Sequence, residues 1–287
     1  MFATAPSIGK TFEIWPAKLT FAAGGAGARD ALDAAMDAAR ELSSSVVADA
    51  ELLAKGAINV LPRGKAGRLA IETVSAFRDV CSPDLPPLLA ALPGAVCDTV
   101  LDVMLEVARN SGGVEFIAVS LGDTVAFHQE PGTRLSGDVD MPPVLGEFLA
   151  ALGEGACGGV AIGGVHSGMP TQGALDVVAI QSKSAAVAGF AASVVADAAA
   201  GVPLPVGPAP KDRLIASAWE GRPVVTAAGL MEPDILWQVL SAAVRQASVL
   251  RDKRLLSAAA LGVKGRGRTI GPVDGDRLLR FGVSEWR

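Results

Sequence analysis

The segment that most constrains the fold is an alanine-rich stretch, residues 184–200, which carries no charge before Asp197. Its run of small and apolar residues predicts a helix, and because no face of that helix is polar, other elements must enclose it on all sides. The charge-free part, Ser184–Ala196, is too short to cross a bilayer, which takes about 20 residues. We therefore expect a core helix that packs closely through small side chains.

The composition bounds the class of protein. The chain has 287 residues, of which 50% are hydrophobic and 19% charged, so it has ample material for a large core. Its formal net charge of -5 argues against nucleic acid as the main partner and disfavours anionic membranes. Residues 1–10 lack the basic start, apolar run and cleavage site of a secretory signal. We expect a cytoplasmic protein, with no nucleic acid and no membrane among its partners.

Cysteine and histidine usage speaks against a disulfide framework and against zinc. The three cysteines, Cys81, Cys97 and Cys157, are odd in number and widely spaced, which suits a reducing compartment. The two histidines, His128 and His166, take part in no HxxxH or HExxH pattern, and no CxxC is present. We expect no zinc site.

Periodicity and turn residues predict both helices and strands along the chain. The expected helices cover residues 29–42, 66–77, 88–109, 184–200 and 233–251. The expected strands cover residues 11–22, 114–127 around a Gly122-Asp123 turn, 175–180, 223–228 and 255–263. Residues 132–143 and 158–173 are expected to be irregular, and residues 201–210 to be an extended proline-rich connection. We expect one unit, residues 1–287, with two intimately packed lobes, 1–145 and 146–287, as the alternative.

Three glycine-rich runs have either a functional interpretation or that of an ordinary turn. Gly164-Val165-His166-Ser167-Gly168 places a histidine beside a serine, but Val165 and Met169 stand where GxSxG requires glycine, so a glycine-rich loop is favoured over a hydrolase. The runs Gly24–Gly27 and Lys264–Arg268 could touch a phosphate, but neither has the spacing of a phosphate-binding loop. Both are therefore interpreted as turns.

Two aspartates are candidates for recognition of a ligand. Asp123 follows Gly122 at a strand end, where a carboxylate can accept hydrogen bonds from a ligand or from its own turn. Asp176 begins an apolar strand directly after a glycine-rich loop, so it must find hydrogen-bond donors or shift its pKa. We expect amides of that loop to be the donors, which makes a structural role as well supported as a ligand role.

Taken together, several segments resemble the ApbE-like superfamily, in its cytoplasmic branch. The resemblance begins with residues 159–161 and 173–176, continues through the apolar strand and the alanine-rich helix, and extends to residues 221–226 and 258–271. Earlier, Gly94-Ala95-Val96 is similar to a helix of that family, and Gly122-Asp123 to the end of its flavin loop. The likeness covers most of the chain from Thr11 to Gly271. It implies an ApbE-like α+β fold, with antiparallel or mixed sheets packed on small-residue helices.

The resemblance also implies a chemistry, from which this sequence departs. Active members bind FAD and, with magnesium, transfer FMN to a protein serine or threonine. Here Ile162 and Gly163 replace two hydroxyl residues, and residues 119–121 replace an Asn-Asn-Gly. The positions of a metal-holding Asp and Thr are occupied by Gly189 and Ser193. A hard divalent ion prefers anionic oxygen ligands, so magnesium is not expected.

We therefore expect a divergent, non-catalytic binding protein for FAD, FMN or a related cofactor, without magnesium-dependent FMN transfer and with no assigned catalytic residues. The alternatives are an active cofactor enzyme, either an FMN transferase or an enzyme of a pterin or one-carbon cofactor, and a ligand-free structural subunit with a protein partner. The sequence leaves the oligomeric state open. The residues expected to line the cofactor pocket are Gly94, Gly122, Asp123, Gly163, Gly164, His166, Ser167 and Asp176.

Overall fold

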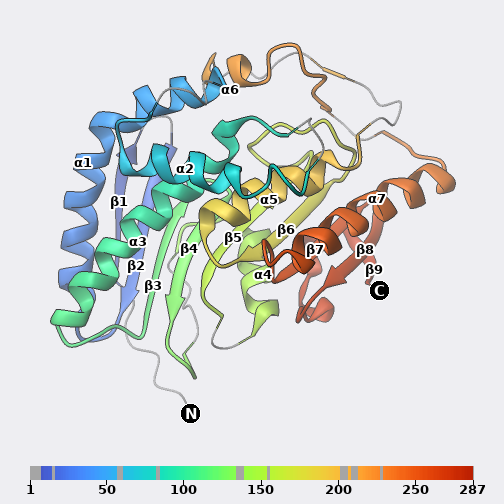
Figure 1. Ribbon diagram of the computed structural model, residues 1–287. Coiled ribbons are helices and arrows are strands. Elements are labelled where there is room, and N and C mark those ends of the chain that lie inside the picture. Colours follow the sequence, from blue (N-terminus) through green and yellow to red (C-terminus); the bar gives the residue numbers. More distant parts are fainter. Residues whose placement is uncertain are drawn as a thin grey trace.

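In the computed structural model the chain forms one nine-stranded sheet with helices on both faces (Figure 1). The structure describes residues 8–14, 17–56, 61–81, 85–133, 139–153, 156–200, 206–207, 213–226 and 229–286. The strands are β1 (Ile8–Ile14), β2 (Ala17–Gly24), β3 (Phe116–Leu121), β4 (Thr124–Gln129), β5 (Gly158–Gly163), β6 (Val177–Ser182), β7 (Ala258–Val263), β8 (Gly265–Ile270) and β9 (Val283–Trp286). They lie in the sheet in chain order; all neighbours are antiparallel except β8 and β9, so the sheet is mixed.

The helices divide into a large layer and a small one. The helices are α1 (Ala28–Ala54), α2 (Lys65–Ser75), η1 (Leu88–Ala91), α3 (Leu92–Asn110), α4 (Pro143–Leu152), α5 (Ala185–Asp197), α6 (Arg213–Ala218), α7 (Pro233–Asp252), η2 (Gly275–Arg277) and η3 (Leu279–Phe281). In Figure 1, α1, α2, α3, α5 and α7 cover one face of the sheet, and α4 lies behind it. Each face of the sheet carries one cluster of buried apolar residues. Successive residues of a strand belong alternately to the two clusters, because side chains along a strand point alternately to the two faces. This arrangement is α+β, as predicted.

Helix α5 is enclosed as its sequence predicts. Every residue from Ala185 to Ala196 is buried, and the Ser184 hydroxyl accepts a hydrogen bond from the Val187 amide at the helix start. The helix lies between α3 and strands β5 and β6, where glycines allow close approach. A Cβ atom on Gly159 would lie 2.1 Å from the backbone of Ala185, and one on Gly94 would lie 2.2 Å from the Ala185 carbonyl oxygen.

The predicted bounds needed several corrections. Residues 158–163 form strand β5 rather than an irregular segment, because their glycines serve the contact with α5 rather than a turn. Helix α1 continues to Ala54, beyond the predicted end at Leu42. Helix α4 was not predicted, because it follows a proline-rich loop. Of the strand expected at residues 223–228, the described part shows only a bridge between Val206 and Val225.

The C-terminal part also differs from the prediction. Strand β7 is not the last, since Lys264 and Gly265 form a tight turn into β8, and β9 follows. Both turn residues have positive φ, 45° and 77°, as a two-residue type I′ hairpin requires. The turn predicted for Lys264–Arg268 is therefore confirmed for Lys264 and Gly265, whereas residues 266–268 belong to strand β8. Of the predicted connection at residues 201–210, all but Val206 and Gly207 lies outside the described residues.

One described helical segment, Leu88–Asn110, is long and apolar enough to cross a membrane by length and composition. It comprises η1 and α3, and 72% of its most apolar window is buried inside the protein. That burial is the state of a core helix, which is consistent with a soluble protein. Cytoplasmic localisation stays a prediction.

Candidate functional site

A cavity of about 280 Å³ lies between the sheet and the helices that cover it. Its walls come from the start of the sheet, from α1, from η1 and α3, from the β3–β4 turn, from the segment after β5, and from α5. The lining residues are Ile14, Ala17, Val46, Ala50, Leu89, Ala90, Leu92, Pro93, Val96, Leu121, Gly122, Asp123, Thr124, Ile162, Gly168, Met169, Gly189 and Ser193. Parts of the chain far apart in sequence thus converge on one cavity.

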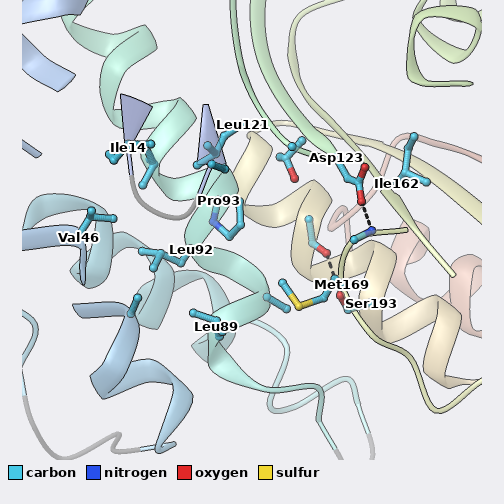
Figure 2. A pocket seen from close by; sticks show the side chains of 18 residues that line it. Ile14, Val46, Leu89, Leu92, Pro93, Leu121, Asp123, Ile162, Met169 and Ser193 are labelled. Atoms are coloured by element: carbon cyan, nitrogen blue, oxygen red, sulfur yellow. Dashed lines mark hydrogen bonds between the residues drawn. The ribbon is translucent and has the colours of Figure 1, made fainter. Parts of the chain in front are cut away.

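The cavity has an apolar end and a polar end. Figure 2 shows Ile14, Val46, Leu89 and Leu92 on one side, and Asp123 with Ser193 on the opposite side. Gly122 and Gly168, both exposed, border the polar end, so this end meets solvent. A bound molecule would bury an apolar body and leave a hydrogen-bonding part near the rim.

Asp123 is the only ionisable residue among the described lining residues. It lies in the two-residue β3–β4 turn, where Gly122 has the positive φ, 59°, that the first position of a type II′ turn requires. Its carboxylate accepts a hydrogen bond from the Gly168 amide, drawn as a dashed line in Figure 2. Burial raises the pKa of Asp123, and the Gly168 hydrogen bond opposes that rise.

Gly189 and Ser193 lie one turn apart on α5 and both face the cavity. The Ser193 hydroxyl donates to the Gly189 carbonyl oxygen at 3.4 Å. A Cβ atom on Gly189 would lie 3.3 Å from the Ala90 carbonyl oxygen and 3.7 Å from Thr124 Oγ1. A small side chain would fit at Gly189 after a shift of a few tenths of an ångström.

The donor set of the cavity does not fit a magnesium ion. Magnesium prefers several oxygen ligands in octahedral geometry, with carboxylates among them. The described lining residues offer one carboxylate, already bonded to an amide, and the hydroxyls of Thr124 and Ser193. Gly189 supplies no side chain at all.

Two of the eight residues predicted for the cofactor pocket, Gly122 and Asp123, line this cavity. Gly94 and Gly163 instead pack against α5, where a Cβ atom on Gly163 would lie 2.8 Å from the Ala192 carbonyl oxygen. Both are packing residues rather than lining residues. The apolar end escaped prediction, since its residues have the periodicity of ordinary core positions.

Three other predicted residues lie in the segment after β5, outside the lining of the cavity. Gly164 has a φ of 102° and turns the chain, and its carbonyl oxygen accepts hydrogen bonds from the Ser167 amide and hydroxyl. The Ser167 hydroxyl also lies 2.8 Å from the Met169 carbonyl oxygen. The His166 side chain is 73% exposed. These contacts hold the loop in shape.

Asp176, the eighth predicted residue, supports the β7–β8 hairpin. Its Oδ2 accepts a 2.6 Å hydrogen bond from the Lys264 amide, and its Oδ1 lies 3.1 Å from Lys264 Nζ and 3.9 Å from His166 Nε2. The donor is therefore in the hairpin, and the expectation that the preceding loop supplies it was wrong. The carboxylate holds Lys264 in its left-handed backbone conformation.

Comparison with known proteins gives a family and no named relative. A family model described as "AbpE bacteria" matches residues 10–269. No curated protein matches the chain. The matched range includes β2 to β7 and every described residue of the cavity lining. The chain therefore belongs to this family.

Proposed function

We propose that this member of the AbpE bacteria family binds a flavin, or a closely related flat cofactor, in the cavity beside α5 and does not carry out magnesium-dependent FMN transfer. The observation that carries the proposal is a convergence of positions. The resemblance to the ApbE-like superfamily assigned Gly122-Asp123 to flavin binding and Gly189 with Ser193 to the metal. The two pairs are separated by 66 or more residues in the sequence, and both line the same cavity.

The shape of the cavity supports a flat amphipathic ligand. Binding sites for small molecules are mostly apolar, with a few polar groups that fix the orientation. The ring system of a flavin has an apolar dimethylbenzene edge, which would pack against Ile14, Val46 and Leu92. Its pyrimidine edge or its ribityl hydroxyls would donate hydrogen bonds to Asp123. At about 280 Å³ the cavity would enclose the ring system and leave the phosphate outside.

Titration with riboflavin, FMN and FAD tests the proposal through quenching of flavin fluorescence, in magnesium or in a chelator. We expect saturable binding with the same Kd in both conditions. Ser193→Leu should abolish binding, because it fills the cavity with apolar volume. Ser248→Leu is the matched control, since Ser248 also bonds to the carbonyl four residues earlier but lies on α7, outside the cavity. Absence of binding by the unmodified protein would refute flavin recognition.

A flavinylation gel tests the second part of the proposal. We expect no transfer of FMN from FAD to an acceptor peptide by the unmodified protein. Gly189→Asp should also fail, because a single restored carboxylate does not rebuild the other lost groups, and catalytic groups act together. Magnesium-dependent labelling of the acceptor would instead establish an active transferase. Tight binding of a pterin in place of flavin would replace flavin as the ligand and favour the pterin alternative.

A further inference from the structure

The cavity wall between β5 and β6 is held at two points by carboxylates from other elements. At one point the Gly168 amide donates to Asp123. At the other, Asp197 Oδ1 accepts hydrogen bonds from the Thr171 hydroxyl at 2.7 Å and from the Gln172 amide at 2.8 Å. Gly168, at the first point, and Met169, between the two points, line the cavity. Their position therefore depends on both carboxylates.

Asp197 is the last residue of α5, and its two carboxylate oxygens differ in their surroundings. Oδ2 is buried and makes no hydrogen bond to the part of the chain that the structure describes. Burial raises the pKa of Asp197 to about 6, opposed by the Thr171 and Gln172 hydrogen bonds and by the charge of Arg222. Its proton equilibrium therefore lies close to physiological pH.

The surroundings of Asp197 contain few other charges. It borders a second cavity of about 650 Å³, whose described lining also includes Arg222, Cys81, Gln172 and Gln246. Arg222 is the charged residue that acts on Asp197. Burial raises the pKa of the Cys81 thiol to about 11, so this thiol is neutral near pH 6, and both glutamines are uncharged.

We propose that Asp197 is a positioning residue for the cofactor cavity: its carboxylate, when ionised, fixes the segment Gly168–Gly173 in the cavity wall, and its protonation loosens that segment and weakens ligand binding. The binding part rests on the proposed function. Hydrogen bonds to an ionised acceptor are roughly twice as strong as those to a neutral one. Protonation of Asp197 therefore weakens both bonds to the wall at once.

Asp197 is distinct from Asp123, which touches the cavity directly. Protonation of Asp123 weakens the Gly168 bond and acts in the same direction, so the tests change Asp197 or its donors and leave Asp123 unaltered. Thr171→Val removes one hydrogen bond that lowers the pKa of Asp197. The midpoint of the loosening should then shift to higher pH.

Riboflavin binding measured between pH 5 and pH 8 tests the coupling, because riboflavin carries no phosphate whose own second pKa of about 6 would titrate in this range. For the unmodified protein we expect affinity to fall roughly fivefold to tenfold as pH decreases, a size typical of coupling between sites, with a midpoint near 6. Thr171→Val should move this step upward in pH, and Asp197→Asn should remove it and leave weak binding throughout. Asp37→Asn, on an exposed part of α1, is the control and should behave as the unmodified protein.

A readout without ligand separates this inference from the proposed function. In amide NMR spectra, the Gln172 signal should titrate with a midpoint near 6 in the unmodified protein and should show no such step in Asp197→Asn. If flavin fails to bind but Gln172 titrates in this way, the flavin proposal fails and the positioning role stands. An unchanged Gln172 signal across this range, or a step in riboflavin affinity that is as large in Asp197→Asn as in the unmodified protein and is not moved by Thr171→Val, overturns the positioning role.

Discussion

At the scale of single residues, aspartates join elements that are distant in the sequence. Asp49 of α1 accepts hydrogen bonds from the Arg63 and Gly64 amides at 2.9 and 2.8 Å, at the start of α2. Asp98 of α3 accepts hydrogen bonds from the Ala185 and Ala186 amides, both at 2.8 Å, at the start of α5. Backbone amides in the first turn of a helix otherwise lack partners, so Asp98 caps α5, whereas Asp49 fixes the residues that lead into α2.

Asp98→Asn tests this role. An asparagine can accept only one of the two amide hydrogens, and its NH₂ group would face the other amide. We expect a loss of about 2 kcal/mol of stability near pH 4, measured by urea unfolding, since a buried donor left without a partner costs about 1–3 kcal/mol. Asp102→Asn, on the exposed side of the same helix, should change stability by less than about 0.5 kcal/mol. Equal losses of stability in Asp98→Asn and Asp102→Asn would contradict the capping role of Asp98.

The pH dependence of this difference follows from the raised pKa. Burial raises the pKa of Asp98 from 3.8 to about 6 in the folded protein, so the folded state holds the proton more tightly than the unfolded state. Stability contributed by the protonated form is present below pH 3.8 and is lost as pH rises to about 6. The stability advantage of the unmodified protein over Asp98→Asn should therefore decrease across that window, by up to about 3 kcal/mol, and should be absent at pH 7. A constant difference would show that the pKa is unshifted.

Sequence reasoning found Asp123 but missed Asp98 and Asp197. Asp123 follows a glycine in a hairpin turn, a local pattern that marks the residue. Asp98 and Asp197 bind backbone amides 87 and 25 residues away. Local sequence periodicity does not predict contacts between residues so far apart in the chain.

At the scale of elements, β5 and α5 depend on each other. Gly159 faces α5 so closely that any side chain would meet backbone atoms, which cannot move aside as a flexible side chain can. The sequence predicted α5 because that helix is apolar on every face. It gave no indication of β5, because glycine is a turn signal in the absence of its packing partner.

Gly159→Ala should destabilise the protein by at least about 3 kcal/mol, measured by urea unfolding. This value is at the upper end of the destabilisation that an overpacked core causes. The control is Gly146→Ala in α4, where the nearest heavy atom to a new Cβ is Met141 Sδ at 3.9 Å. This control should gain up to about 1 kcal/mol, because alanine is the better helix former. Tolerance of alanine at Gly159 would mean that α5 packs less closely than described.

At the scale of the whole molecule, the cavity joins the two halves of the chain. Ile14, Val46 and Leu92 come from the first half, and Met169 and Ser193 from the second. The sheet continues from one half to the other through the pairing of β4 with β5. The family resemblance predicted a pocket shared by both halves, but the apolar lining from Ile14, Val46 and Leu92 could not be predicted from the sequence, because it depends on the order of all the strands in the sheet.

A ligand in this cavity should stabilise both halves together. At a flavin concentration 100 times Kd, we expect a gain of about 2.7 kcal/mol in the free energy of unfolding, by mass action. Differential scanning calorimetry should show one transition that moves upward as a unit, and no movement for Ser193→Leu. Two transitions, of which one moves, would show that the ligand contacts a single half.

The order of the strands has a consequence for synthesis on the ribosome. Because every strand pairs with its neighbour in the chain, each new strand can join the edge left by the previous one as it emerges. Until α5 is made, however, the small residues that face it on α3 and β5 have nothing to cover them. A nascent chain that stops between β5 and α5 therefore exposes an open strand edge beside an uncovered apolar surface, and this is the stage at which a chaperone would protect it most.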